Sequence, residues 1–209
     1  MGTSNCDFSP MKIEIAAIIS NIRKELEDSE SILAGESTGF LEKLEKIREK
    51  FMLMESMASS FYLNCYLSSY TNLYNELSSS VQRLSEIRHG ALIVIERKDS
   101  VDQYIQKGTP IDATCTPALL EAIFYPGNPL HDGAALIKGN HIISAANILP
   151  LNTITIKNKK LGTRHRSAIG LSEVCDALIM VVSEETGRIS FALNGQLYPI
   201  AYQEKGEGK

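Results

Sequence analysis

The sequence lacks the features that mark several common classes of protein. Its four cysteines, at positions 6, 65, 115 and 175, lie 50 or more residues apart, which matches neither a zinc-ligand pair nor a dense disulfide framework. No apolar run approaches the roughly 18 residues that a membrane helix needs, and the N-terminus shows no secretory signal pattern. We therefore expect reduced thiols in a cytoplasmic protein without a membrane partner.

The chain also has little excess charge and none of the common phosphate-binding signatures. Its formal net charge is −4 and its pI is about 5.6, so we expect no general attraction to nucleic acid or anionic lipid. Neither GxxxxGK followed by Ser or Thr nor GxGxxG occurs, which excludes the P-loop and the usual dinucleotide site. Any phosphate that this protein binds must be held in another way.

The 209 residues suffice for one good core plus an appendage, which we place at the N-terminus. Ser9–Pro10 is typical of a helix start, and an apolar stripe follows from Ile13 to Leu26. Gly35 ends this helix, and a second is predicted from near Ser37 to Cys65 with a heptad-like seam. Residues 1–65 should thus form a helical hairpin with a regulatory or oligomerising role. Its seam could pack within the chain or against a partner helix.

The hydrophobic period changes beyond the hairpin, where residues 66–202 predict one α/β (α+β) domain with a mixed β-sheet surrounded by helices. Helices are expected over 71–88 and 116–126 and from Ser167 onward. Strands are expected over 91–96, 134–138, 141–149, 177–183 and 188–193, with Gly139–Asn140 as a two-residue hairpin turn. Residues 203–209 are predicted to be a flexible tail.

Residues 164–166 read Arg-His-Arg between Thr163 and Ser167, in a turn that leads into the last predicted helix. One interpretation is a solvated basic loop, because charged residues are mostly exposed. The other is a polyphosphate cradle, since the arginine fork suits phosphate oxygens and a helix N-terminus adds unpaired N–H donors. The small and hydroxyl-bearing residues around the triplet favour the cradle.

A second candidate stretch is "PLHDGAAL" at 129–136, where three unusual residues meet at the mouth of a strand. An Asp–Gly pair is often only a turn. In the functional interpretation Gly133 lets a ligand approach the backbone, Asp132 serves as a base or metal ligand, and His131 is a metal ligand beside it.

A third candidate is "VSEETG" at 182–187, the end of a strand and the turn that follows. Paired glutamates in a turn are most often solvated. If this turn lies beside the arginine triplet, Ser183 could bond phosphate oxygens, and Glu184 or Glu185 could orient an arginine or bind a cation.

These three stretches, joined by "ILPL" at 148–151 and in this order, resemble the diadenylate cyclase (DisA N-terminal type) family over about residues 85–200. The two-helix extension further resembles the soluble, sporulation-associated class of that family. The resemblance implies a nucleotidyltransferase that condenses two ATP molecules into cyclic di-AMP and two pyrophosphates with Mn²⁺ or Mg²⁺. Each 3′-hydroxyl attacks the other α-phosphate across two facing subunits, so a homo-oligomer is implied, a hexamer being one candidate.

The resemblance also implies a role for each residue. Asp132 activates the 3′-hydroxyl and holds the metal together with His131, and Gly133 and Ala134 lie against the nucleotide. Leu149 lines the adenine pocket through its backbone, although Ile148 stands where some relatives have an aromatic residue. Arg164 and Arg166 are catalytic, and the triphosphate is bound by Thr163, Arg164, His165, Arg166, Ser167, Ser183 and Glu184.

Two alternatives belong to other functional classes. The first is a catalytically silent regulator that senses ATP or a cyclic dinucleotide. The presence of Asp132 argues against it, because a sensor has little need for a base. The second is a nucleic-acid-binding module on residues 157–166, which has no interleaved aromatic residue to stack bases. We expect the hairpin to restrain the reaction, because a catalytic domain should carry its own facing surface.

Overall fold

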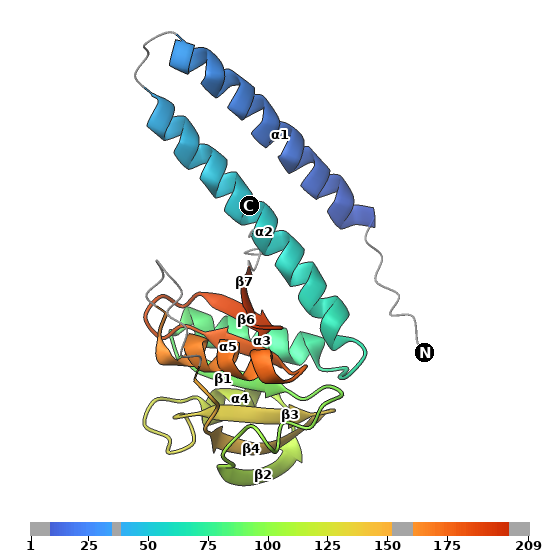
Figure 1. Cartoon of the computed structure of the whole chain (residues 1–209). Coiled ribbons are helices and arrows are strands. Elements are labelled where there is room, and N and C mark those ends of the chain that lie inside the picture. Colours follow the sequence, from blue (N-terminus) through green and yellow to red (C-terminus); the bar gives the residue numbers. More distant parts are fainter. Residues whose placement is uncertain (1–8, 35–38, 152–160, 201–209) are drawn as a thin grey trace, which may run out of the picture.

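The computed structural model describes residues 9–34, 39–151 and 161–200, and it shows a helical hairpin standing on a sheet domain (Figure 1). The predicted tail at 203–209 and the helix boundaries at Gly35 and Ser37 lie outside the described residues. No helix in the described part of the chain is long and apolar enough to cross a membrane.

The hairpin consists of α1 (Ser9–Ala34) and α2 (Phe40–Leu67), which pack along each other. Lys50 and Glu25 form an ion pair between them, with Nζ and Oε1 2.5 Å apart. Large apolar side chains of the predicted seam stay exposed in the single chain, among them Leu44 and Phe51. The hairpin alone therefore does not bury its apolar residues.

The last turns of α2 belong to the sheet domain. Leu63 and Leu67 are fully buried in its core, so the predicted domain boundary at residue 65 falls inside a continuous helix. Cys65, on the same turns, is disulfide-bonded. The expectation of four reduced thiols is therefore wrong for this residue, whereas Cys115 and Cys175 are free and buried.

The sheet has seven strands in the order β2-β4-β3-β1-β5-β6-β7. Only β1 and β3 pair in parallel among neighbours, and all other pairs are antiparallel, which confirms a mixed sheet. The strands are β1 (Ala91–Ile95), β2 (Thr109–Thr114), β3 (Ala134–Lys138), β4 (His141–Asn147), β5 (Leu178–Val182), β6 (Ile189–Leu193) and β7 (Gln196–Ile200).

Helices cover both faces of the sheet, and β1 lies buried between them. Because successive strand residues point to opposite faces, Ala91, Ile93 and Ile95 join the core under α2, α3 (Tyr74–Glu86) and α4 (Pro117–Ile123). Leu92 and Val94 join a second core under α5 (Thr163–Val174). Burial on both faces explains why β1 reads as a continuous apolar run.

Two strands were not predicted from the sequence, and both carry a proline. β2 contains Pro110 and β7 contains Pro199, and each lies at an edge of the sheet. A proline removes a ladder donor and is tolerated at an edge. The alternation of apolar and polar residues is correspondingly weak in the sequences of these two strands, because each pairs with only one neighbouring strand.

The start of α5 is a correction to the sequence prediction. The helix begins at Thr163 and not at Ser167, because the Gly162 carbonyl accepts a hydrogen bond from the Arg166 amide at 3.2 Å and so closes the first turn. The Arg-His-Arg triplet therefore lies within the first helical turn and not in a loop before it.

Candidate active site

Strand register brings the predicted site segments to one end of the sheet. Ala91 pairs with Val182, so the start of β1 lies beside the end of β5, where Ser183 follows. The parallel pairing of β1 with β3 places the start of β3, just after Asp132, at the same end. Ala134 pairs with Asn147, which brings the end of β4 and the following Leu149 there as well.

The N-terminal turn of α5 reaches this end of the sheet through an ion pair. Arg164 Nη1 and Glu184 Oε2 lie 2.8 Å apart, and the Arg164 side chain is 25% exposed against 66% for Glu184. The turn after β5 thus lies beside the arginine triplet, and Glu184 orients an arginine, which is one of the two roles that its position in the sequence suggested.

The remaining residues of the triplet's turn differ in exposure. Thr163 and Arg166 are exposed, whereas Ser167 is buried. Burial is the main cause that lowers the pKa of His165 below its ordinary value; Glu185 opposes this and Arg164 adds to it. The His165 imidazole is therefore neutral near pH 7, and the net positive charge of the triplet comes from its arginines.

The loop before Asp132 fixes His131 in one tautomer. His131 Nδ1 lies 2.5 Å from the Asn128 carbonyl oxygen, which only accepts, so Nδ1 carries a proton, and in the neutral ring the lone pair lies on Nε2. The side chain of Asn128 holds this loop, because its Nδ2 donates to the Ala122 carbonyl and its Oδ1 accepts from the Leu130 amide. Asp132 itself is exposed.

Gly133 has a reason to be glycine that differs from the predicted one. Its φ is 123°, and an added Cβ would lie 2.7 Å from the Ala146 carbonyl carbon and 2.8 Å from the Asn147 oxygen. The backbone of β4 fills the space where a Cβ would stand, so this packing by itself requires glycine at position 133.

A buried amide that sequence reasoning missed holds the same region together. Asn147 is 1% exposed, and its Nδ2 donates to the Ala134 carbonyl at 2.7 Å. Its Oδ1 accepts from Ser144 Oγ at 2.9 Å and from the Gly108 amide at 3.0 Å. One side chain thereby joins β3, β4 and the residue that precedes β2. Neither Asn147 nor Asn128 carries a motif, so only their hydrogen bonds reveal them.

The first two residues of the "ILPL" segment face different surroundings. The Leu149 side chain is buried in the core under α5, while Ile148 is 58% exposed. With its side chain in the core, Leu149 has only its backbone to offer to a ligand.

The side chains of the site offer few ligands to a divalent metal. The described residues contain no group of three or more His, Cys, Asp or Glu side chains that could hold a metal ion. His131 nevertheless offers a lone pair at Nε2, and a histidine ligand usually donates its other ring N–H to a carbonyl, as here. The site therefore fits an ion that takes few protein ligands and completes its shell with phosphate and water oxygens.

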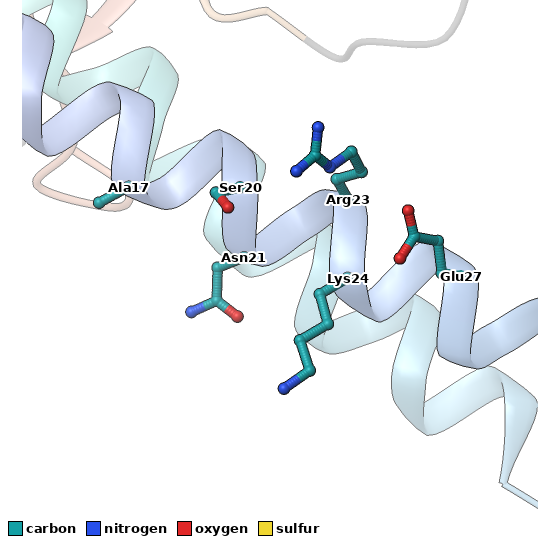
Figure 2. Close-up of a pocket in the computed structure, with 6 residues that line it drawn as sticks. All are labelled: Ala17, Ser20, Asn21, Arg23, Lys24 and Glu27. Carbon is teal, nitrogen blue, oxygen red and sulfur yellow. The ribbon is translucent and has the colours of Figure 1, made fainter.

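A surface depression on α1 contains none of these residues. It is lined by six exposed side chains of that helix alone (Figure 2), namely Ala17, Ser20, Asn21, Arg23, Lys24 and Glu27. Because a single helix face encloses no volume, we assign no binding function to it.

Comparison with known proteins supports one family along most of the chain. The family model described as DisA bacterial checkpoint controller nucleotide-binding matches residues 78–197, and that described as diadenylate cyclase CdaS, N-terminal, matches residues 3–70. "Diadenylate cyclase CdaS" of Bacillus thuringiensis (strain BMB171) is 51% identical over 191 residues, covering 91% of this chain and 95% of the relative. "Cyclic di-AMP synthase CdaS" of Bacillus subtilis (strain 168) is 52% identical over 158 residues, or 76% of each chain.

A solved structure of similar sequence shares the fold. A crystal structure from Bacillus cereus, described as a hypothetical membrane spanning protein, superposes with a TM-score of 0.76 at 50% identity and covers 93% of this chain and 95% of its own. The arginine-bearing helix, the Asp-Gly-Ala strand and the hairpin all fall within the matched regions. The chain therefore belongs to the diadenylate cyclase family, the nucleotidyltransferases that make cyclic di-AMP from ATP.

Proposed function

We propose that this chain condenses two ATP molecules into cyclic di-AMP with release of two pyrophosphates. The observation that carries the proposal is the convergence of Asp132, Ser183 and the Arg164–Glu184 pair at one end of the sheet in a member of this family. In this proposal residues 66–202 catalyse in the cytoplasm, and residues 1–65 regulate or assemble the enzyme.

The proposed reaction is an in-line displacement at the α-phosphate. Asp132 accepts the proton of a ribose 3′-hydroxyl, and the oxygen forms a bond to the α-phosphorus of the other ATP. The bond from that phosphorus to the bridging oxygen breaks, and pyrophosphate leaves with the electron pair. Arg164 and Arg166 stabilise the charge that develops on the leaving group.

A divalent ion supplies charge neutralisation at the phosphates in this family, and Mn²⁺ and Mg²⁺ are the proposed ions. His131 through Nε2 and Asp132 through its carboxylate would hold it. Thr163, His165, Ser167 and Ser183 would bind triphosphate oxygens, and Gly133, Ala134 and the Leu149 backbone would contact the nucleoside.

The product requires two sites that face each other. Cyclic di-AMP contains two new phosphodiester bonds. Forming each bond needs one general base and one group of phosphate-binding residues, and one chain supplies only one of each. We therefore propose a homo-oligomer that opposes the active sites of two subunits, and a hexamer would contain three such pairs.

The test is to incubate the purified full chain with ATP and either Mn²⁺ or Mg²⁺ and to identify the nucleotides by mass spectrometry. Cyclic di-AMP and pyrophosphate are the expected products. Bound but unconverted ATP with both metals would favour the silent regulator, and formation of ADP or AMP alone would refute the cyclase proposal.

A further inference from the structure

Gly90 occupies the connection between α3 and β1, at the end of the sheet where the site residues converge. It is buried, and its φ lies outside the positive range that favours glycine. Its backbone conformation therefore suits any amino acid, and the reason for glycine at this position must come from what surrounds it.

The neighbour that excludes a side chain here is the guanidinium group of Arg164. A Cβ added to Gly90 would lie 2.5 Å from Arg164 Nη1 and 2.7 Å from Arg164 Cζ, both far below van der Waals contact. Gly108 and Gly133 differ, because a Cβ at either would meet backbone atoms. Because Gly90 has no side chain, the Arg164 guanidinium can occupy the space beside it.

The other side of this space is formed by the turn after β5. Glu184 Oε2 lies 2.8 Å from Arg164 Nη1, and a Cβ at Gly90 would come within 3.0 Å of Glu184 Cβ. The turn is fastened to the end of α3, because Ser85 Oγ donates to the Gly187 carbonyl at 2.5 Å. Segment 85–90 therefore contacts Arg164 directly and also holds the turn that carries its partner.

We propose that Gly90 is a positioning residue for Arg164. The open space at Gly90 and the carboxylate of Glu184 together confine a long, flexible side chain to one place before the substrate binds. A guanidinium that is already in place loses less conformational freedom when it binds phosphate. The inference rests on the proposed function, in which Arg164 binds the triphosphate.

The first test is Gly90→Ala in the full chain. The added methyl group meets the movable end of Arg164 and not backbone, so the variant should fold with a Tm close to that of the wild type. The displaced guanidinium should lose one charge-assisted hydrogen bond to phosphate, so kcat/KM should fall about tenfold to a hundredfold. Affinity for an ATP analogue with a methylene bridge between the α- and β-phosphates should fall in parallel.

The matched control is Gly139→Ala, which also adds one methyl group. Gly139 has a φ of 56° and nothing within 4 Å of an added Cβ, and it lies in the β3–β4 turn at the other end of these strands. This variant should lower the Tm through backbone strain and leave kcat/KM unchanged. The two variants separate an effect on the site from an effect on stability.

A double-mutant comparison decides whether the effect passes through Arg164. Without its guanidinium the space is empty, so Arg164→Ala and Gly90→Ala/Arg164→Ala should bind the analogue equally well, within about twofold. If Gly90→Ala alone fails to fold, Arg164→Ala should restore folding. A Gly90→Ala variant that equals the wild type, or one whose defect persists at full size without Arg164, would overturn the inference. Failure of the proposed function would differ, because the wild type itself would then make no cyclic di-AMP, whether or not it binds the analogue.

Discussion

The first turn of α5 concentrates positive charge where the helix dipole is already positive. Each arginine in that turn opposes the dipole by about 0.3–1 kcal/mol. Glu184 offsets the charge of Arg164 through the ion pair at 2.8 Å. In the proposed function, a bound triphosphate would offset both arginines and the dipole together.

Replacing Arg164 or Arg166 by alanine should impair both binding and rate. The arginines are expected to bind phosphate in the ground state and more strongly in the transition state, where the leaving group carries more charge. KM should therefore rise and kcat should fall, and in each single variant kcat/KM should fall by about tenfold to a hundredfold. Steady-state kinetics of cyclic di-AMP formation measure both constants. Arg48→Ala, on an exposed face of α2, is the control. Unchanged KM and kcat in both site variants would show that the Arg-His-Arg triplet is only a solvated basic surface.

Asp132→Asn should separate binding from chemistry. The substitution keeps the shape of the side chain and removes the anionic base, so kcat should fall by about 10²–10⁴ while affinity for the methylene-bridged analogue persists. The control is Asp112→Asn, at an exposed position with a φ of 47°, a conformation that asparagine also adopts. Near-normal turnover of Asp132→Asn would show that another group accepts the proton.

His165 should make the protein less stable at acidic pH. Its pKa in the folded chain lies below the ordinary value of 6.5, chiefly because of burial, so the unfolded chain binds the proton more readily. This contribution is fully present above pH 6.5 and is lost as the pH falls toward the folded-state pKa. His165→Gln should therefore show a shallower loss of unfolding free energy between pH 7 and pH 5 in urea titrations. Parallel profiles for variant and wild type would contradict the assignment.

Helix α4 and the loop after it deliver His131 and Asp132 to the site. Thr116 begins α4 with its Oγ1 accepting from the Leu119 amide at 3.3 Å, and Pro117 follows at the first helical position. Helix α4 then leads into the loop that Asn128 fastens to the Ala122 carbonyl. The geometry of the site therefore depends on a helix that contains none of its residues.

Thr116→Ala should lower the free energy of unfolding by about 1 kcal/mol, because it removes the N-cap acceptor. Urea denaturation measures this change. Thr116→Ser keeps the hydroxyl and should stay close to the wild type. Equal stability of the alanine and wild-type chains would show that this hydrogen bond contributes nothing.

The hairpin leaves several large apolar side chains exposed in the single chain. Ile13 is 72% exposed and Leu41 is 80% exposed, and both lie on helices that project away from the sheet domain (Figure 1). An oligomer that covers this surface could either oppose two active sites or hold them apart. We expect it to hold them apart, since the catalytic domain should carry its own facing surface.

Deleting residues 1–60 should change the oligomer size seen by light scattering and raise cyclic di-AMP formation per catalytic domain. The deletion keeps Leu63 and Leu67, which belong to the core, so the truncated chain should fold. Circular dichroism and thermal melting serve as the check on folding. A folded truncation with clearly lower activity would show that the hairpin assembles the active enzyme.

The sequence alone determined those features that local chemistry or a distinctive motif specifies. The hairpin, the central strands and the Gly139–Asn140 turn follow from hydrophobic period and turn residues, and the family follows from the Asp-Gly-Ala and Arg-His-Arg segments. The edge strands β2 and β7 could not be predicted, because a strand with one neighbour and a proline carries little pattern.

Tertiary structure alone decided which distant groups meet. The contact between Arg164 and Glu184, the space that Gly90 leaves for the guanidinium, and the three hydrogen bonds of Asn147 join residues far apart in the chain. The sheet brings these residues together through strand register, and single glycines and asparagines have no local signature. Their roles follow from packing, because the physical reason for each residue is an atom contributed by another strand or helix.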